Sequence, residues 1–142
     1  MKGKILVTIQ FTCLALLALF TDWLTLPWWV YLFLATSGFL AFWAMAVMRP
    51  GNFNIVPTPV EHGILVSRGP YKLIRHPMYT SIFIFAFGLL AGQFDYIKLA
   101  ISLGLVAGLV VKMLYEEDLL CIHYPGYKSY MKKTKRVIPF VW

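Results

Sequence analysis

Long apolar runs alternate with short polar segments along this chain, and four of the runs approach the length of a membrane-spanning helix. They cover residues 5–20, 28–48, 78–94 and 96–115. About 20 mostly apolar residues cross the roughly 30 Å hydrocarbon core of a bilayer as an α-helix. The first run is slightly short and contains Gln10. The pattern predicts an all-α integral membrane protein with about four transmembrane helices.

The segments between these runs differ in length and composition. Residues 21–27 and Asp95 form short, slightly acidic turns, whereas residues 49–77 hold five of the eight prolines and three of the ten glycines. That is too many for a continuous helix. We expect a cytoplasmic loop there, ordered or with short extended structure. We also expect one domain over residues 1–142, with two N-terminal transmembrane helices in 1–48 and a ligand-binding core, including a helical C-terminal tail, in 49–142.

Composition excludes two other classes of protein. The chain is 60% apolar and 13% charged, whereas an average soluble domain is about 45–50% apolar and about 25% charged. A water-soluble globular fold would leave too much apolar surface uncovered. The high apolar content, with 17% aromatic residues, also excludes intrinsic disorder, which requires low hydrophobicity.

The positions of the charges explain the net charge of +7. A basic surface can mark nucleic-acid binding, but twelve of the thirteen Lys and Arg residues lie in the N-terminus, in residues 49–75 or from Lys112 onward, and only Lys98 lies elsewhere. Four crossings put these twelve on one side of the membrane, as the positive-inside rule requires of the cytoplasmic side. We therefore predict cytoplasmic termini and no nucleic-acid partner. Cys13 and Cys121 are interpreted as packing residues, and no metal site is expected.

An acidic triplet contradicts this charge pattern. Glu116, Glu117 and Asp118 follow the fourth apolar run, at the expected C-terminal end of its helix. Both a helix C-terminus and the inner face of a bilayer favour cations. Something cationic should therefore compensate the carboxylates. Two alternatives are open: a solvated salt-bridge surface with the basic residues in 128–136, or a cationic ligand. Neighbouring helical positions point about 100° apart, so at most one or two of the three side chains face one site.

A second group of residues lies just before the third apolar run. Pro77 suits the first turn of a helix, because its missing N–H has no partner there anyway, and this places Arg75 and His76 beside a helix N-terminus. Such an end binds anions, and an arginine beside it strengthens that binding. The alternative is that Arg75 and His76 contact lipid phosphates while Tyr71 and Tyr79 join the interfacial aromatic belt. Taken with the triplet, the pattern fits one zwitterionic ligand with an amino-acid end, and S-adenosylmethionine adds a sulfonium charge.

At these residues the sequence resembles the isoprenylcysteine carboxyl methyltransferase family, within the wider group of membrane phospholipid-type methyltransferases. The resemblance covers residues 43–139. Its motifs are Asn52-Phe53, Pro57-Thr58-Pro59, Leu65-Val66-Ser67-Arg68-Gly69-Pro70-Tyr71, Arg75-His76-Pro77-Met78-Tyr79, Glu116-Glu117, Tyr127, Tyr130 and Arg136-Val137-Ile138-Pro139.

The resemblance implies a helical membrane methyltransferase of a prokaryotic plasma membrane. It implies that S-adenosylmethionine binds in a pocket open to the cytosol. A lipid-like or small acceptor, of the isoprenylcysteine carboxylate, phospholipid or thiol type, would enter from the bilayer. The membrane lipids are the other expected partners.

The resemblance also implies site residues. The cofactor would be bound by two glutamates, by the 66–71 loop and by the segment at the start of the third helix: Val66, Gly69, Pro70, Tyr71, Arg75, His76, Pro77, Tyr79, Glu116 and Glu117. The catalytic residues would be Glu117 and Arg136, and Arg136 would orient the acceptor. If the acceptor has to lose a proton, Glu117 or His76 is the candidate base.

Two other functions remain open from the sequence. Membrane sterol reductases have a similar C-terminal helical core but bind NADPH, whose phosphates need cationic partners, and the acidic triplet opposes that reading. A non-enzymatic lipid-binding protein would use its Arg and Lys clusters for anionic headgroups. The first would bind NADPH and the second would bind neither cofactor.

Overall fold

The structure, a computed structural model, describes residues 2–48 and 63–141. Its helices follow in the order α1 (Lys2–Leu19), α2 (Val30–Val47), the 3₁₀ helix η1 (Gly69–Lys72), α3 (Pro77–Gly92), α4 (Tyr96–His123) and α5 (Tyr127–Lys133). Across both described ranges there is no named strand. The expected all-α class is confirmed.

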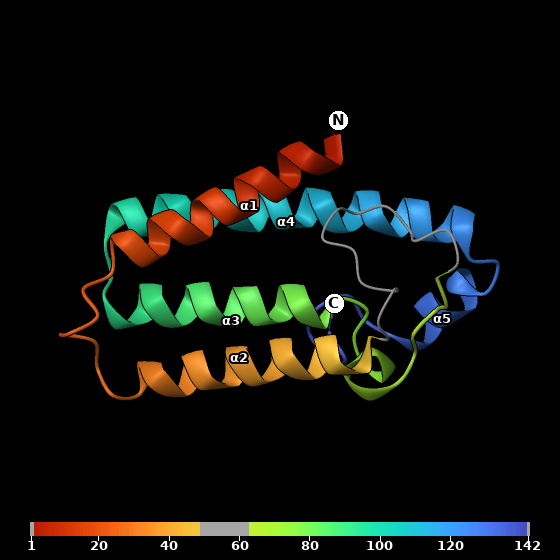
Figure 1. The fold of residues 1–142 in the computed structure, drawn as a ribbon, viewed down its shortest axis with the longest axis horizontal. Coiled ribbons are helices and arrows are strands. Elements are labelled where there is room, and N and C mark those ends of the chain that lie inside the picture. Colours follow the sequence, from red (N-terminus) through yellow and green to blue (C-terminus); the bar gives the residue numbers. More distant parts are fainter. Residues whose placement is uncertain (1, 49–62, 142) are drawn as a thin grey trace.

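The four long helices alternate in direction (Figure 1). The start of α1, the end of α2, the start of α3 and the end of α4 therefore lie at the same end of the molecule, together with η1 and α5. This end carries most of the basic residues, whereas Lys98 lies in the first turn of α4 at the opposite end. The arrangement agrees with an even number of crossings. The side of the membrane that each end faces stays a prediction.

Three of the four long helices, α1, α2 and α4, are long and apolar enough to cross a membrane, and α3 is a shorter apolar helix of 16 residues. At about 1.5 Å per residue α3 spans about 24 Å, and α4, with 28 residues, spans about 42 Å. The two helices are joined by a short turn, so α4 continues well past the start of α3. That difference in length places Lys112 to Glu117 beside the residues that begin α3.

The fourth helix was expected to end at residue 115, but α4 continues to His123. It ends there because Tyr124 precedes Pro125, and the residue before a proline disfavours helical geometry. The acidic triplet therefore lies inside the helix and not at its C-terminal end, so the expected penalty from the helix dipole is wrong. Smaller differences affect the other ends: α1 begins before residue 5, α2 begins after residue 28 and α3 ends before residue 94.

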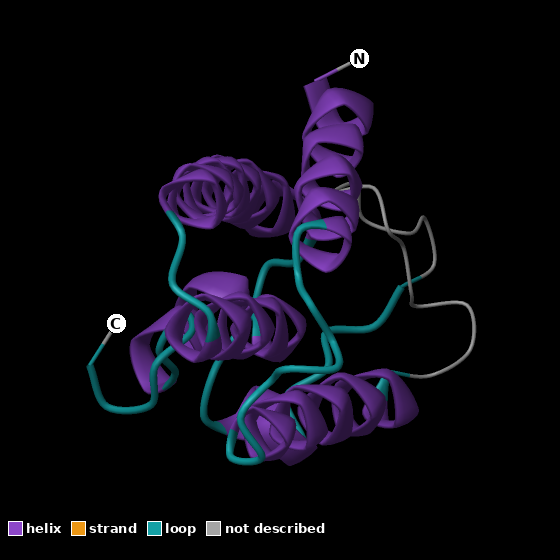
Figure 2. Ribbon diagram, turned by 90° about the vertical axis from the view of Figure 1, so that its left-hand side faces the viewer, coloured by secondary structure: helices purple, strands orange, loops and turns teal. Residues whose placement is uncertain are grey.

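The helices pack mainly as two pairs, α2 with α3 and α1 with α4, and α3 joins the pairs through fewer contacts with α4 (Figure 2). Gly88 and Gly92 allow α2 to approach α3 closely. A Cβ atom at Gly88 would lie 2.7 Å from the Cβ of Phe33, and one at Gly92 would meet Val30. Small residues four positions apart are a common contact between membrane helices, because they let backbones approach.

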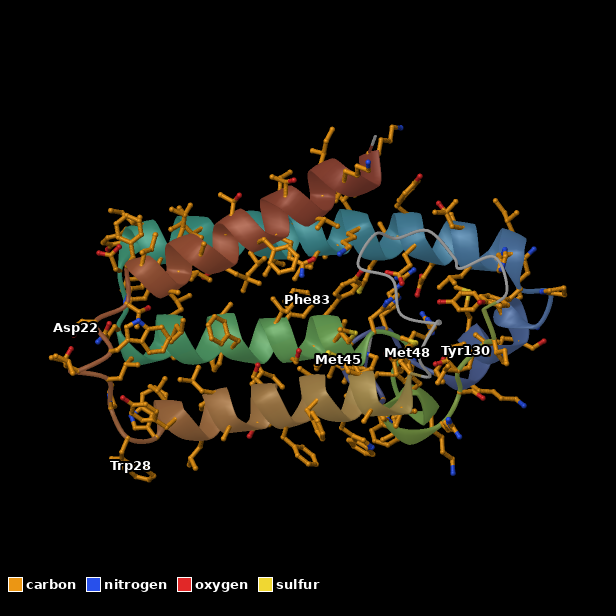
Figure 3. All side chains as sticks on the ribbon, in the orientation of Figure 1. Asp22, Trp28, Met45, Met48, Phe83 and Tyr130 are labelled. Carbon is orange, nitrogen blue, oxygen red and sulfur yellow. The ribbon has the colours of Figure 1, made fainter. Side chains whose placement is uncertain are left out.

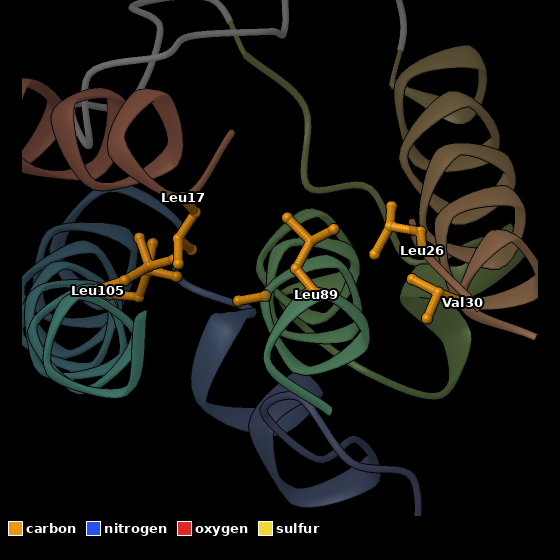
Figure 4. Packing of buried hydrophobic residues seen from close by; sticks show 7 residues of the cluster. Leu17, Leu26, Val30, Leu89 and Leu105 are labelled. Atoms are coloured by element: carbon orange, nitrogen blue, oxygen red, sulfur yellow. The ribbon is translucent and has the colours of Figure 1, made fainter. Parts of the chain in front are cut away.

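A row of apolar side chains joins the two pairs (Figure 4). Leu89 of α3 lies between Leu17 and Leu105 on one side and Leu26 and Val30 on the other. Cys13 packs against this cluster, as expected. Outside it, large apolar side chains such as Phe39 and Phe42 are more than half exposed. Lipid, and not water, suits such a surface.

Candidate functional site

The C-terminal tail pairs with the segment that leads into α3. Ile74 and Lys135 form a parallel bridge. The Arg75 N–H donates to the Lys135 carbonyl at 2.7 Å, and the His76 N–H donates to the Arg136 carbonyl at 3.0 Å. His76 is the residue before the first turn of α3 and Pro77 is in that turn, as predicted. Residues 135 and 136 of the tail thus hold the segment that begins α3 in place.

Gly69 has a structural reason to be glycine. Its φ is +58°, in the left-handed region that L side chains rarely adopt, and a Cβ there would lie 2.7 Å from the side chain of Val47. It opens η1, in which Pro70 and Tyr71 are buried. The Tyr71 carbonyl accepts a hydrogen bond from the Tyr130 hydroxyl at 2.6 Å. The loop is therefore fixed between the end of α2 and α5.

Glu117 lies at the centre of a buried ionic cluster with Arg75, His76 and Arg136, which we call the Glu117 cluster. Arg75 Nε lies 2.7 Å from Glu117 Oε1, and Arg136 Nε lies 3.0 Å from Oε2. His76 Nε2 lies 3.4 Å from Oε1. The Arg75 Nη1 group also donates to the carbonyls of Met131 and Thr134. One carboxylate thus joins α4, the start of α3 and the tail.

The cluster decides between the two explanations for the acidic triplet only in part. Glu117 does pair with a basic residue of the tail, but the Glu117 and Arg75 side chains are 4% and 7% exposed and Arg136 is 27% exposed. The solvated salt-bridge surface is therefore wrong for Glu117, because the pairing is buried. Asp118 is exposed, and Glu116 points elsewhere. The expected divergence of neighbouring side chains is confirmed.

A cavity of about 380 Å³ lies beside the Glu117 cluster, between the first four helices near the start of α3. Its wall is formed by residues from α1, α2, η1, α3 and α4, from the end of α2 and from the segment that leads into α3: Gln10, Phe11, Leu14, Ala41, Met45, Met48, Tyr71, Arg75, His76, Pro77, Met78, Tyr79, Ser81, Ile82, Lys112 and Glu116. Figure 3 shows Met45 and Met48 at the same end of the molecule as Tyr130, with Asp22 and Trp28 at the opposite end. The cavity therefore belongs to the end that carries η1 and α5.

Polar contacts orient the charged and aromatic groups of the cavity wall. The Tyr79 hydroxyl donates to Glu116 Oε2 at 2.7 Å. The rings of His76 and Tyr79 stack, with centroids 5.3 Å apart and planes 14° apart. Burial, with the Glu116 charge as a second cause, raises the pKa of Tyr71 well above its ordinary value. The Tyr71 phenol therefore stays protonated at neutral pH.

Six of the predicted binding residues line the cavity: Tyr71, Arg75, His76, Pro77, Tyr79 and Glu116. In the described part of the chain, the other four do not belong to its wall, namely Val66, Gly69, Pro70 and Glu117, and neither does the predicted catalytic residue Arg136. The predicted catalytic pair, Glu117 and Arg136, are in contact with one another. Their catalytic role stays a prediction. Arg49 and the motif residues Asn52-Phe53 and Pro57-Thr58-Pro59 lie outside the described residues.

Several wall residues had no assigned role in the sequence interpretation, among them Gln10, Met45, Met48 and Lys112. Lys112 was counted as a topological charge, and Gln10 was noted only as a polar residue in an apolar run. A usable signal existed for both, because polar and ionisable residues inside membrane segments are functional candidates by default. The two methionines carried no such signal.

A second, apolar hollow of about 530 Å³ lies on another face of α3, between α3 and α4. Phe83 and Phe87 of α3, Leu103 and Val106 of α4 and Val137 of the tail contribute to its wall. We call it the apolar groove. Within the described residues it shares no wall residue with the cavity. The Ser102 hydroxyl, which is buried in this wall, has no hydrogen-bond partner in the described structure.

Comparison with known proteins adds the family. A search of curated proteins found no match. The model of the isoprenylcysteine carboxyl methyltransferase family matches residues 29–123. The matched region includes η1, α3 and most of the cavity wall, but it excludes α1 and the tail after α4. It covers about two thirds of the chain, and it contains the motifs on which the cavity is built. The chain therefore belongs to the isoprenylcysteine carboxyl methyltransferase family.

Proposed function

We propose that this protein is an S-adenosylmethionine-dependent methyltransferase that modifies a lipid-like or small acceptor at the cytoplasmic face of a membrane. The observation that carries the proposal is the cavity at the start of α3, with the Glu116 carboxylate and the rings of Tyr71 and Tyr79 in its wall. Its volume of about 380 Å³ lies within the range of small-molecule sites, about 300–1,000 Å³. Membership of a methyltransferase family supports this reading over a reductase or a lipid-binding protein.

The donor set fits the cofactor. When bound, S-adenosylmethionine supplies an electrophilic methyl group on a sulfonium. Glu116 offers a carboxylate to a positively charged group, and the Tyr79 hydroxyl fixes the orientation of that carboxylate. Aromatic faces also attract cations, typically within about 6 Å of the ring centre, and the Tyr71 ring belongs to the cavity wall. The Tyr79 ring already contacts His76 and the Lys112 ammonium. In this site Glu116 would bind the positively charged group of the cofactor, and the tyrosines would enclose the cofactor. The apolar wall from α1 and α2 would exclude water.

The Glu117 cluster stabilises part of the cavity wall. Glu117 connects Arg75, His76 and Arg136, and two of these, Arg75 and His76, also line the cavity. We infer that Glu117 and Arg136 fix the position of the start of α3 relative to α4. Methyl transfer requires the reacting atoms to be held at about 3–3.5 Å, so an error in this position would slow the reaction.

The need for a base depends on the acceptor. A carboxylate or thiolate acceptor needs none, whereas an amine or alcohol has to lose a proton. A base must lie within hydrogen-bond reach of the proton that it removes. His76 lines the cavity, whereas Glu117 is paired with two guanidinium groups, those of Arg75 and Arg136, and lies outside the wall. His76 is therefore the better of the two candidates.

The apolar groove supports a lipid-like acceptor. Its wall is made almost entirely of aliphatic and aromatic side chains from α3 and α4. It ends at Val137 and Ile138, which follow Arg136 of the Glu117 cluster. We infer that the apolar chain of the acceptor lies in this groove, so that its polar end reaches the level of the cavity.

Binding and transfer should be measured on the full chain in detergent. Titration calorimetry with S-adenosylhomocysteine and with NADPH tests the cofactor, and we expect binding of the first only. Incubation of membranes with methyl-labelled S-adenosylmethionine, followed by lipid extraction, tests the acceptor, and we expect label in the lipid fraction. Binding of NADPH in place of S-adenosylhomocysteine, or of neither, would overturn the proposal.

A further inference from the structure

Lys112 carries a buried charge that neither the family motifs nor the Glu117 cluster uses. It lies on α4 and is 3% exposed. Its ammonium donates to Gln10 Oε1 of α1 at 2.8 Å and lies 5.2 Å from the centre of the Tyr79 ring. In the described residues no carboxylate oxygen lies within 4 Å of it. Burying an ammonium without an ion-pair partner costs free energy of folding, so the presence of Lys112 at this position needs an explanation.

Lys98 provides a comparison on the same helix. It is 4% exposed, and its ammonium donates to Gln93 Oε1 at 2.9 Å. Gln93 in turn donates to the Asp22 carbonyl and to Thr25, so this lysine belongs to a network that joins two turns. Lys98 does not line the cavity. A structural role explains Lys98 fully.

Lys112 differs because it faces the cavity. Both Lys112 and Gln10 belong to the cavity wall, and so does Glu116, one helical turn after Lys112. Residues four apart lie on the same face of a helix. The wall therefore presents one cation and one carboxylate side by side. An ammonium has three donors, and Gln10 accepts one hydrogen bond from it.

The other strong cation of the wall, Arg75, is already engaged in the Glu117 cluster. Arg75 Nε pairs with Glu117 at 2.7 Å, and Arg75 Nη1 donates to two carbonyls of the tail segment. The position that the sequence assigned to Arg75, partner of a ligand carboxylate, is thus better filled by Lys112.

We propose that the Lys112 ammonium binds the carboxylate at the amino-acid end of the cofactor, while Glu116 binds the neighbouring ammonium. Gln10 is a positioning residue, which holds the lysine side chain against the cavity wall. Helix α1, which lies outside the region matched by the family, thereby contributes to cofactor selection. This inference rests on the proposed function, because it names the partner of one end of the proposed cofactor.

The test compares two ligands and three proteins. The ligands are S-adenosylhomocysteine and its decarboxylated analogue, which keeps the amine and lacks the carboxylate. The proteins are the wild type, Lys112→Met and the matched control Lys98→Met, all as full chains in detergent. We expect the wild type and Lys98→Met to bind S-adenosylhomocysteine about 10-fold to 100-fold more tightly than the analogue. In Lys112→Met the two affinities should become equal.

A loss of folding is distinguished by a second variant. Lys112→Met leaves the Gln10 amide without its partner, whereas Gln10→Leu with Lys112→Met removes both polar groups. Replacing both partners with apolar groups is close to neutral for stability. The double variant should therefore unfold at nearly the wild-type temperature and also lose the preference. A preference that persists in Lys112→Met or in the double variant overturns this inference and leaves the proposed function intact, whereas a wild type that binds neither ligand overturns both.

Discussion

Glu116 and Glu117 are neighbours in the sequence, but their carboxylates belong to different structures. Glu116 Oε2 accepts a hydrogen bond from Tyr79 in the cavity wall, and Glu117 accepts from Arg75 and Arg136 in the buried cluster. The turn of about 100° per residue in a helix separates them. A binding role and a supporting role are thus carried by adjacent positions, and they can be tested separately.

Glu117→Gln should lower stability more than binding. The amide carries no charge, so Arg75 and Arg136 lose their common counter-charge, and breaking a buried ion pair costs on the order of 3 kcal/mol. Thermal unfolding in detergent measures this. Glu116→Gln is the matched variant: it should unfold within about 1 kcal/mol of the wild type, yet bind S-adenosylhomocysteine about tenfold more weakly. Equal destabilisation by the two substitutions would contradict this division.

His76→Ala should weaken binding of S-adenosylhomocysteine. The imidazole lines the cavity and stacks on Tyr79, so its loss enlarges the cavity and frees the tyrosine that orients Glu116. We expect a decrease in affinity of about tenfold. His123→Ala, at an exposed position at the end of α4, is the control and should bind like the wild type. Unchanged affinity in His76→Ala would remove this residue from the site.

Gly88→Ala should separate α2 from α3. The added Cβ would lie 2.7 Å from the Cβ of Phe33, and the helices have to move apart, which costs about 1–3 kcal/mol in an overpacked core. Gly104→Ala adds the same atom where nothing lies within 4 Å, and it should be neutral or slightly stabilising because alanine favours helices. Unfolding in detergent compares the two, and a neutral Gly88→Ala would show that the helices do not pack this closely.

Val106→Trp should block the apolar groove. Val106 lies in its wall, and the indole would fill space that we assign to the apolar chain of the acceptor. We expect methyl transfer to lipids to fall at least about tenfold, with binding of S-adenosylhomocysteine unchanged. Val111→Trp, at an exposed position of α4 that lies outside the described groove wall, is the control. Full lipid methylation by Val106→Trp would exclude the groove as the acceptor path.

The start of α3 could be predicted from the sequence, and the end of α4, which was placed too early at residue 115, is also marked locally by Pro125. Pro77 determines the first through a local rule, and His76 precedes the helix as expected. The partners of the two glutamates could not be predicted, because they come from residues 75, 79 and 136, and no rule about neighbouring residues can supply such partners. Gln10 and Lys112 illustrate the same limit, because their contact joins positions 102 residues apart. From the sequence, Gln10 and Lys112 could each be recognised only as a polar residue in an apolar run.

The tail also affects the order in which the protein can be assembled. Chains are synthesised from the N-terminus, and their parts begin to fold as they emerge, so α1 to α4 are complete before residues 131–137 exist. Until those residues leave the ribosome, Arg75 lacks the carbonyls of Met131 and Thr134, and Glu117 lacks Arg136. The start of α3 also lacks its backbone partners at Lys135 and Arg136. A membrane-inserted chain that has not yet extended through the tail would thus hold four helices and an incompletely supported cavity.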